Sequence, residues 1–334
     1  MANEVLILSD RDVRQCLDRM GMPQAIELVE GVLRAHAEGR AIMPAKLHME
    51  LAPLGVESWM NAMPAYLAPG DLMGLKWIGG FGGNPAAGRP YIVGLIVLVE
   101  ARTGALVAVM DGTQITSVRT GASAGVAARC LAPEGPATVA LIGAGVQGES
   151  ALDALRCTLD IREVRIADAN ARKAAALTAR FAGRAGTHAA VAPTVAQAVR
   201  DAQVVVTATP ADEPLVRQAW LAPGALVLTL GSYREVDDAV FTLADKIVVD
   251  NWEQAQHRGS LKEPVEHGLV ARESLWGELP DIVDGKLAGR QRGDEHIVCC
   301  EVGMGSQDLA LACRVHQMAR EAGLGTRAPF TCPA

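Results

Sequence analysis

The sequence predicts an α/β protein with two parts, a doubly wound parallel sheet in the middle of the chain and an α+β part formed by its two ends. The chain has 334 residues, a length typical of about two domains. Half of its residues are hydrophobic and 21% are charged, which is enough apolar material for two cores. After residue 136 strand-type runs alternate with helical runs, whereas residues 44–111 hold strand-type runs separated by Gly and Pro.

The first third of the chain predicts two helices followed by a mostly antiparallel sheet. Residues 9–38 are expected to form the helices, because Ser9 and Asp12 have the spacing of a capping box and Met22-Pro23 is a second helix start. In the sheet, residues 101–105 have the composition of a hairpin turn. The most apolar run, residues 91–100, is too short to cross a bilayer and predicts a buried strand.

The remaining elements predict the parallel sheet. Residues 113–131 are Ala-rich and helical, and apolar strands then alternate with helices, which is typical of a parallel sheet covered on both faces. The expected strands cover residues 138–143, 164–168, 189–191, 203–209, 225–232 and 246–251. The expected helices end near residue 159, cover residues 170–181, follow Thr194, and cover residues 307–322.

Composition excludes several classes of partner. The chain has 38 acidic and 31 basic residues, a net charge of −7, and no basic block, so neither nucleic acid nor an anionic membrane is an expected partner. No secretory leader is recognised, and the seven scattered cysteines lack a CxxC pair, so we expect reduced thiols and a cytoplasmic location. The seven histidines show no ligand spacing, so no metal site is predicted.

A glycine motif follows the first strand of the predicted parallel sheet. The six residues of this G-x-G-x-x-G motif are Gly143, Ala144, Gly145, Val146, Gln147 and Gly148. The first glycine allows a tight turn, the second lets a pyrophosphate approach the backbone, and the third lets helix and strand pack closely. The order strand, turn and helix is that of a Rossmann-type dinucleotide site, although a glycine-rich turn without a ligand is the alternative.

Asp168 supports the dinucleotide interpretation and indicates which dinucleotide binds. It ends the next strand, twenty residues after Gly148. A carboxylate there accepts hydrogen bonds from the adenosine ribose and repels a 2′-phosphate, so the sequence favours NAD. Arg172 lies nearby and could accommodate that phosphate, so NADP stays possible.

The carboxyl ends of two further strands are expected to border the same ligand, since ligands bind at that edge of a parallel sheet. These residues are Thr207, Ala208, Thr209, Gly231 and Ser232. The alternative for the threonines is ordinary strand propensity.

Three cations are candidates for binding a substrate carboxylate. Lys76 lies in an apolar strand, where a lysine is costly unless it is paired, and Arg119 lies on the helix that leads to the glycine motif. Lys46, after Met43-Pro44, is a weaker candidate. A lysine that faces outward and a solvated helix arginine are the alternatives.

Several motifs resemble the ornithine cyclodeaminase/μ-crystallin family. They are GLKW at residues 74–77, VRTGA at 118–122, LIGAGVQGES at 141–150 and KIVVDNWEQAQHRGSL at 246–261. The resemblance covers about residues 5–325. That family includes archaeal-type alanine dehydrogenases, ketimine reductases and related imino-acid reductases.

The resemblance implies an organisation and a set of roles. It implies a homodimer, with a substrate-binding and dimerisation domain at residues 1–118 and 306–334 and a Rossmann domain at residues 119–305 that binds NAD(P). Lys76 and Arg119 match the family's substrate-carboxylate anchors, and Lys46 stands where many members have an arginine. Gln147 falls at the family's contact with the nucleotide phosphate.

Two departures from the family's cyclodeaminases concern the type of reaction. Cyclodeaminases carry an acidic residue where this chain has Asn61, and an Asp where it has Ser232-Tyr233. An asparagine does not titrate, and a tyrosine with a pKa near 10 is a weak base at neutral pH. Glu301 is a candidate replacement for the lost acid, with a surface carboxylate as the alternative.

The leading hypothesis is therefore an NAD(P)H-dependent imino-acid (ketimine) reductase or amino-acid dehydrogenase that acts on a small α-amino or α-imino acid. One alternative is an ornithine cyclodeaminase-type lyase that uses NAD catalytically. The other is a non-enzymatic protein that binds a small ligand together with NAD(P).

Overall fold

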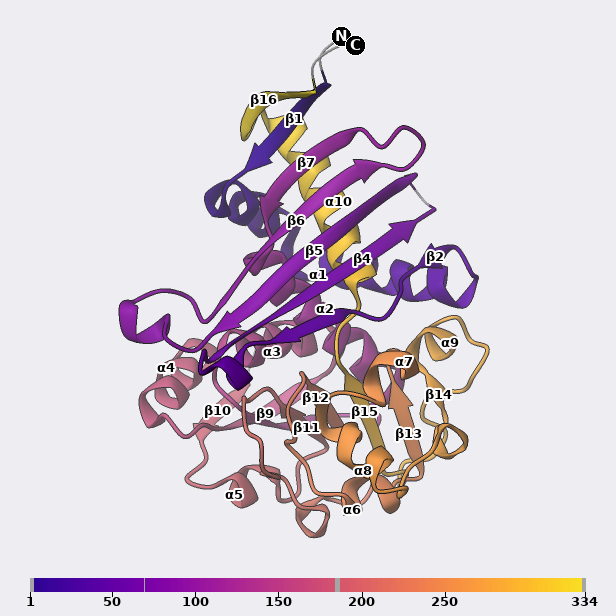
Figure 1. The fold of residues 1–334 in the computed structure, drawn as a ribbon. Coiled ribbons are helices and arrows are strands. Elements are labelled where there is room, and N and C mark those ends of the chain that lie inside the picture. Colours follow the sequence, from indigo (N-terminus) through magenta and orange to yellow (C-terminus); the bar gives the residue numbers. More distant parts are fainter. Residues whose placement is uncertain (1–2, 69, 184–186, 332–334) are drawn as a thin grey trace. The chain divides into compact units, whose positions relative to one another are not determined.

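The structure, a computed structural model, describes residues 3–68, 70–183 and 187–331 (Figure 1). The chain forms two units. Unit 1 contains residues 1–119 and 304–334, and unit 2 contains residues 120–303. The helix α2 (Thr113–Leu131) begins in unit 1 and continues in unit 2.

Unit 1 is built on a mainly antiparallel sheet. Its strands are β1 (Asn3–Leu8), β2 (Ala41–Ile42), β3 (Leu47–Glu50), β4 (Ser58–Leu67), β5 (Leu72–Phe81), β6 (Ile92–Glu100), β7 (Leu106–Asp111) and β16 (Thr326–Thr331). The order is β16-β1-β7-β6-β5-β4-β2, with β3 also paired to β4. Only β1 and β7 are parallel among these described pairs. The predicted antiparallel sheet is confirmed, while β1 and β16 had no clear signal in the sequence.

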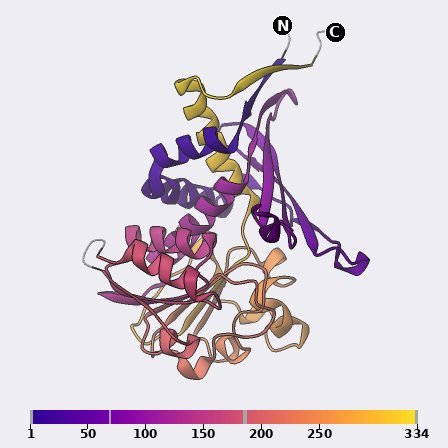
Figure 2. The ribbon, with the colours of Figure 1, turned by 90° about the vertical axis from the view of Figure 1, so that its left-hand side faces the viewer.

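Two helices cover one face of this sheet (Figure 2). The helix α1 (Asp10–Ala37) has the predicted capping box at Ser9 and Asp12, and Gly21, with φ +70°, interrupts it just before the predicted second start. The helix α10 (Gly305–Ala322) packs against β4, β5 and β6.

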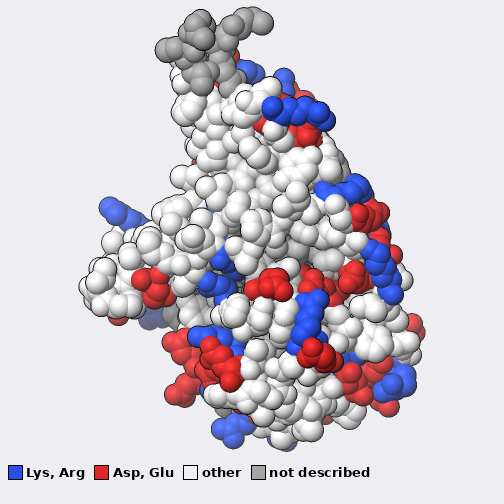
Figure 3. Space-filling view, turned by 45° about the vertical axis from the view of Figure 1, so that its right-hand side comes forward, with Lys and Arg blue, Asp and Glu red and all other residues white. Residues whose placement is uncertain are grey.

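The other face of the sheet is apolar and open in the single chain. Its strands carry large hydrophobic side chains that are 37% to 63% exposed, namely Leu47, Met49, Met73, Leu75, Val93 and Leu95. The prediction that residues 91–100 form a buried strand is therefore half wrong, because in β6 only alternate residues such as Ile96 and Leu98 are buried. Figure 3 shows mainly uncharged atoms over this part of unit 1.

Unit 2 is built on a parallel sheet, as predicted. Its strands are β8 (Ala137–Ile142), β9 (Ile161–Ala167), β10 (His188–Val191), β11 (Val204–Thr207), β12 (Leu226–Leu230), β13 (Lys246–Val249), β14 (Gly277–Glu278) and β15 (Ile297–Glu301). They follow the order β10-β9-β8-β11-β12-β15-β13-β14, and every pair among the described residues is parallel. The order reverses between β8 and β11, which is the switch point where such sheets bind ligands.

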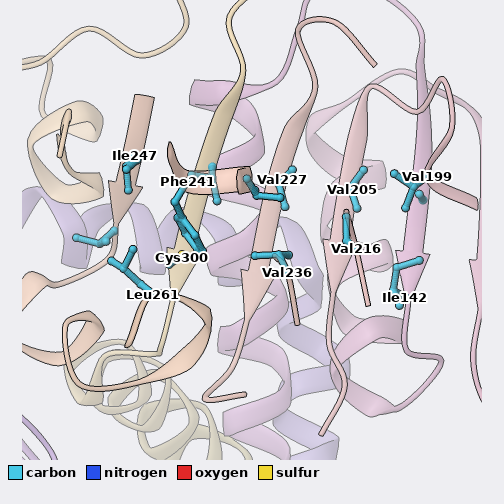
Figure 4. Close-up of a cluster of buried hydrophobic side chains, with 14 of the residues drawn as sticks. Ile142, Val199, Val205, Val216, Val227, Val236, Phe241, Ile247, Leu261 and Cys300 are labelled. Carbon is cyan, nitrogen blue, oxygen red and sulfur yellow. The ribbon is translucent and has the colours of Figure 1, made fainter. Parts of the chain in front are cut away.

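Helices connect these strands. They are α3 (Val146–Thr158), α4 (Ala171–Phe181), α5 (Val195–Val199), α6 (Ala239–Thr242), α7 (Trp252–Ala255), α8 (Lys262–Glu266) and α9 (Leu279–Val283). A core of small β-branched side chains around Val205 and Val227, closed by Phe241, packs on the sheet (Figure 4). The central strands of this sheet are buried at every residue, and β8 positions the glycine motif at its end.

Six cysteines, of which Cys299 and Cys300 are buried in β15, carry free thiols in the described part of the chain. Cys332 lies outside the described residues. Within the same ranges no helix is long and apolar enough to cross a membrane, and no group of side chains has the arrangement of a metal site.

Candidate functional site

The glycine motif adopts a conformation that only glycine tolerates at two positions. Gly143 has a φ of +106°, and a Cβ there would lie 2.5 Å from the carbonyl oxygen of Ala208. A Cβ on Gly148 would lie 2.0 Å from the carbonyl oxygen of Gly143. The sharp turn after β8 and the close packing of α3 on it therefore both require the motif's glycines, as predicted.

The start of α3 fits an anionic group. Gly145 is the N-cap of this helix and supplies no side chain, so the first backbone N–H groups have no side-chain cap. A Cβ on Gly145 would meet no heavy atom within 4 Å, so the space above it is open. Among the described residues the buried Oε1 of Gln147 has no hydrogen-bond partner, and Val146 is exposed. Helix N–H groups and open space over glycine suit a pyrophosphate.

Asp168 lies directly beside this loop, in the place that the dinucleotide interpretation requires. Its Oδ2 accepts a hydrogen bond from the Ala144 N–H at 2.7 Å, and its Oδ1 accepts from the Asn170 N–H at 2.6 Å. The carboxylate is half-buried at the end of β9, and each oxygen retains a lone pair for a further donor. Arg172 is exposed and belongs to the first turn of α4.

The predicted residues at the ends of β11 and β12 lie in two different environments. Thr207 is fully buried, and Ala208 and Thr209 contact the position of Gly143. Gly231 has a φ of +149°, and Ser232 is exposed.

Sequence analysis did not identify Glu235 in this region. Glu235 is fully buried, and its Oε1 accepts hydrogen bonds from the Thr209 N–H at 2.6 Å and from the Thr209 hydroxyl at 2.9 Å. Burial raises the pKa of this carboxyl to about 7.

Unit 1 holds a second polar cluster, made by Lys76 of β5, Arg119 of α2 and Asp308 of α10. Lys76 Nζ lies 2.7 Å from Asp308 Oδ2, and Arg119 Nε lies 3.1 Å from Asp308 Oδ1. The exposed fractions are 2% for Lys76, 8% for Arg119 and 0% for Asp308. Both alternatives, an outward lysine and a solvated arginine, are therefore wrong.

Burial lowers the pKa of Lys76 to about 8. Burial is the largest cause and Arg119 acts in the same direction, whereas the Asp308 carboxylate raises this pKa. Lys76 Nζ also donates to the hydroxyl of Thr116 at 3.3 Å. Two cations and one anion leave the cluster with an excess of one positive charge when Lys76 is protonated.

Hydrogen-bond donors remain available in the cluster. Within the described ranges the Arg119 side chain is bonded only through Nε, so its two terminal nitrogens form a fork that suits a carboxylate. Asp308 was missed by sequence analysis, although an acidic residue beside the buried Leu309 and Leu311 of α10 was a usable signal.

Lys46 and Asn61 lie on neighbouring parts of unit 1. Lys46 is half-buried just before β3. Asn61 of β4 is buried, and the Nδ1 of His48 donates to its Oδ1 at 2.8 Å. Strand register places Met63 opposite Lys76, so Asn61, two residues away, is on the same face of the sheet as Lys76.

Glu301 is not a surface carboxylate. It is buried at the end of β15 in unit 2, and the hydroxyl of Ser123 donates to its Oε2.

Comparison with known proteins shows the family to which the chain belongs. The model of the ornithine cyclodeaminase/mu-crystallin family matches residues 6–323. The chain belongs to this family. The resemblance deduced from the sequence motifs is thereby confirmed.

Relatives within the ornithine cyclodeaminase/mu-crystallin family include enzymes of amino-acid chemistry. Alanine dehydrogenase from Archaeoglobus fulgidus is 34% identical over 98% of this chain and 99% of its own length. A solved archaeal alanine dehydrogenase dimer with bound NAD has a TM-score of 0.91 at 34% identity, and covers 98% of this chain and 100% of that chain. Δ1-pyrroline-2-carboxylate reductase from Thermococcus litoralis, solved with NADH and L-proline, has a TM-score of 0.91 at 28% identity over 96% and 99% of the two chains.

The Lys76–Asp308 pair predicts a pH-dependent effect of Asp308→Asn on stability. We expect the variant to lose about 3–5 kcal/mol of unfolding free energy near neutral pH, because two buried cations lose their anion. Lys76 has a folded pKa below its unfolded value, so its contribution to stability rises with pH between the two values. The unfolding free energy lost in Asp308→Asn should therefore be smaller at about pH 9.5 than near neutral pH, because Lys76 deprotonates more readily in the variant than in the wild type.

Urea unfolding at both pH values measures this difference. Asp71→Asn is the control, because Asp71 pairs with the exposed Arg102 in the same unit and should change stability by less than about 1 kcal/mol at either pH. An Asp308→Asn variant as stable as the wild type at neutral pH would contradict the prediction.

Proposed function

We propose that this member of the ornithine cyclodeaminase/mu-crystallin family is an NAD(H)-dependent oxidoreductase that reduces the C=N bond of a small α-imino acid, or oxidises the corresponding α-amino acid. The buried Lys76–Asp308–Arg119 cluster is the observation that carries the proposal. It offers one uncompensated positive charge and a guanidinium fork, which suit a single carboxylate. The amino- and imino-acid activities named for its relatives support the same substrate class.

Each residue of the cluster has a separate role in this proposal. Arg119 binds the substrate carboxylate through its terminal nitrogens, and Lys76 adds a second positive charge beside it. Asp308 holds both cations in place without itself contacting substrate. Lys46 is proposed as a third, more peripheral cation.

Unit 2 is proposed as the nucleotide-binding domain and unit 1 as the substrate-binding and dimerisation domain. The loop from Gly143 to Gly148 would hold the pyrophosphate, with Gln147 beside it, and Asp168 would accept hydrogen bonds from the adenosine ribose. The ends of β11 and β12, from Thr207 to Thr209 and at Gly231 and Ser232, would border the nicotinamide half. When bound, the nicotinamide supplies or accepts the hydride at the substrate α-carbon.

The protein itself must position the substrate and manage one proton. A carboxylate fixed between Arg119 and Lys76 places the α-carbon at a defined point, which is the main demand of a reductase. An α-iminium nitrogen that arrives protonated requires no acid. For a neutral imine, Lys76 Nζ is a buried proton donor whose pKa of about 8 keeps it largely protonated at neutral pH.

A cyclodeaminase reaction is the less favoured alternative within this family. It needs a base beside the substrate amine, and Asn61 supplies only an amide whose oxygen is already bonded to His48. The second departure, at Ser232, likewise supplies no carboxylate. Net oxidation of NADH by an α-imino acid distinguishes the proposed reductase from a non-enzymatic protein that binds a small ligand together with NAD(P).

We also propose that the protein is a homodimer in the cytoplasm. The open face of the unit 1 sheet carries large apolar side chains, and a second copy of the same face is a suitable cover. The solved archaeal alanine dehydrogenase is a dimer, which supports this occupant. The free thiols of the described cysteines suit a reducing compartment.

The proposed activity predicts stoichiometric oxidation of NADH with an α-imino acid. Absorbance at 340 nm would follow NADH with Δ1-pyrroline-2-carboxylate, and with pyruvate plus ammonia or methylamine. Arg119→Ala should lower kcat/KM by a factor equivalent to about 2–3 kcal/mol of lost transition-state stabilisation, because a buried charge-assisted contact is lost. NADH affinity should change little.

Two further measurements decide between the alternatives. Arg102→Ala, in which the removed arginine is exposed in the same unit, should keep wild-type kcat/KM. Incubation with ornithine and catalytic NAD, followed by amino-acid chromatography, should give no proline. Proline and ammonia over many turnovers would replace the reductase proposal with the cyclodeaminase one.

Asp168 predicts a preference for NADH over NADPH. Replacing it with Ser removes the charge that repels a 2′-phosphate, so the ratio of NADPH to NADH affinity should rise by about tenfold or more. Calorimetry on the wild type and Asp168→Ser measures both ligands, with Asp160→Ser, an exposed change before β9, as the control. Tighter NADPH than NADH binding by the wild type would overturn the preference.

The proposed dimer predicts that charge on the open face gives monomers. The double variant Leu75→Glu/Leu95→Glu places two carboxylates on that face and should elute as a monomer in size-exclusion chromatography with light scattering. Leu243→Glu, a change at an exposed leucine of unit 2, should leave the dimer intact. A wild-type monomer at micromolar concentration would contradict the proposal.

A further inference from the structure

Glu235 connects a loop at the switch point of the parallel sheet to the rest of unit 2. The loop, residues 209–216, follows β11. Thr209 is the first residue of this loop, and it donates two hydrogen bonds to the Glu235 side chain, one from its N–H and one from its hydroxyl. At the end of the loop the Glu235 carbonyl oxygen accepts from the N–H groups of Leu215, at 2.9 Å, and Val216, at 3.1 Å. One residue therefore closes both ends of the loop.

Glu235 is itself held by a hydrogen bond from its backbone to Ser260. Its N–H donates to the hydroxyl oxygen of Ser260 at 2.9 Å, and that hydroxyl donates to the carbonyl oxygen of Tyr233 at 3.1 Å. The carboxylate is fully buried, and no cation pairs with it within the described ranges. A buried acid without a counter-ion is costly and marks a position with a specific task.

The held loop is in contact with the glycine motif. A Cβ at Gly143 would lie 2.5 Å from the Ala208 carbonyl oxygen and 2.9 Å from the Cγ2 of Thr209. The residues that Glu235 fixes therefore form one wall of the turn that begins the proposed pyrophosphate loop. A shift of Thr209 would move this wall.

We propose that Glu235 is a positioning residue for the dinucleotide, which holds Thr209 and the loop after β11 against the glycine turn and whose charge state sets the affinity for NADH. This inference rests on the proposed binding of NAD(H) to unit 2. Glu235 acts through Thr209 and is not proposed to contact the cofactor.

The charge of Glu235 changes in the physiological range. Burial raises its pKa to about 7, and the hydrogen bonds from Thr209 oppose that rise. The groups that face it from neighbouring elements are the hydroxyls of Thr207, Thr209 and Ser260 and the thiol of Cys300 in β15. Burial raises the pKa of that thiol to about 12, so it stays neutral.

The charged residue next to Glu235 in the sequence, Arg234, is already paired. Arg234 forms ion pairs with Asp238 and Glu263. NADH carries two phosphate charges, so it should bind more tightly to the neutral form of Glu235. By linkage, its affinity should fall as pH rises through about 7.

NADH fluorescence titration at about pH 6 and about pH 8.5 tests the proposal. The wild type should bind NADH at least about threefold more weakly at the higher pH. Glu235→Gln keeps an acceptor for Thr209 but cannot ionise, so its affinity should equal that of the wild type at pH 6 and stay constant. Glu235→Ala leaves the Thr209 donors without an acceptor and should bind about tenfold more weakly at both pH values.

Glu163→Gln is the matched control, because Glu163 is a partly exposed acid near the start of β9 in the same sheet and should keep the wild-type pH profile. An identical pH dependence in the wild type and Glu235→Gln would overturn the inference, as would wild-type affinity in a folded Glu235→Ala. Absence of NADH binding by the wild type at either pH would instead overturn the proposed function.

Discussion

The ion pairs of Asp308 with Lys76 and Arg119 are the interaction on which unit 1 depends. They join a strand, the start of a helix and the last helix of the chain through one buried carboxylate. Three charges buried together are stable only while each has a partner, so the positions of β5, α2 and α10 within the unit are linked. The same requirement gives the cluster its chemistry, because the charges do not cancel.

The two sheets follow different rules of burial. In unit 2 the central strands have helices on both faces, and strands such as β8 and β12 are buried at every residue. In unit 1 only the face that packs against α1 and α10 is closed. Buried polar side chains, such as Lys76 and Asn61, lie on this closed face, and the open face carries large apolar side chains.

Much of this arrangement could be predicted from the sequence. The capping box at Ser9, the alternation of strands and helices, and the turn at Gly143 depend on local preferences, which a single sequence records directly. The insertion of β15 between β12 and β13 depends on long-range pairing and left no local signal. Glu235 and Asp308 were missed for the same reason, because their partners are distant in the sequence. Thr209 lies 26 residues from Glu235, and Arg119 lies 189 residues from Asp308. The half-exposed state of β6 was also hidden, since an apolar run looks the same whether both faces of the strand are covered or only one.

The discontinuity of unit 1 has a consequence for synthesis on the ribosome. Unit 2 is continuous, so all its described strands have been synthesised once residue 303 is made. The sheet of unit 1 is translated first, yet α10 and β16 are translated last. Until they emerge, Lys76 and Arg119 have no Asp308, and the face of β4, β5 and β6 that α10 covers stays in water. The nascent chain therefore carries an incompletely covered apolar sheet throughout the translation of unit 2. During this interval the exposed apolar surface available to a chaperone is largest.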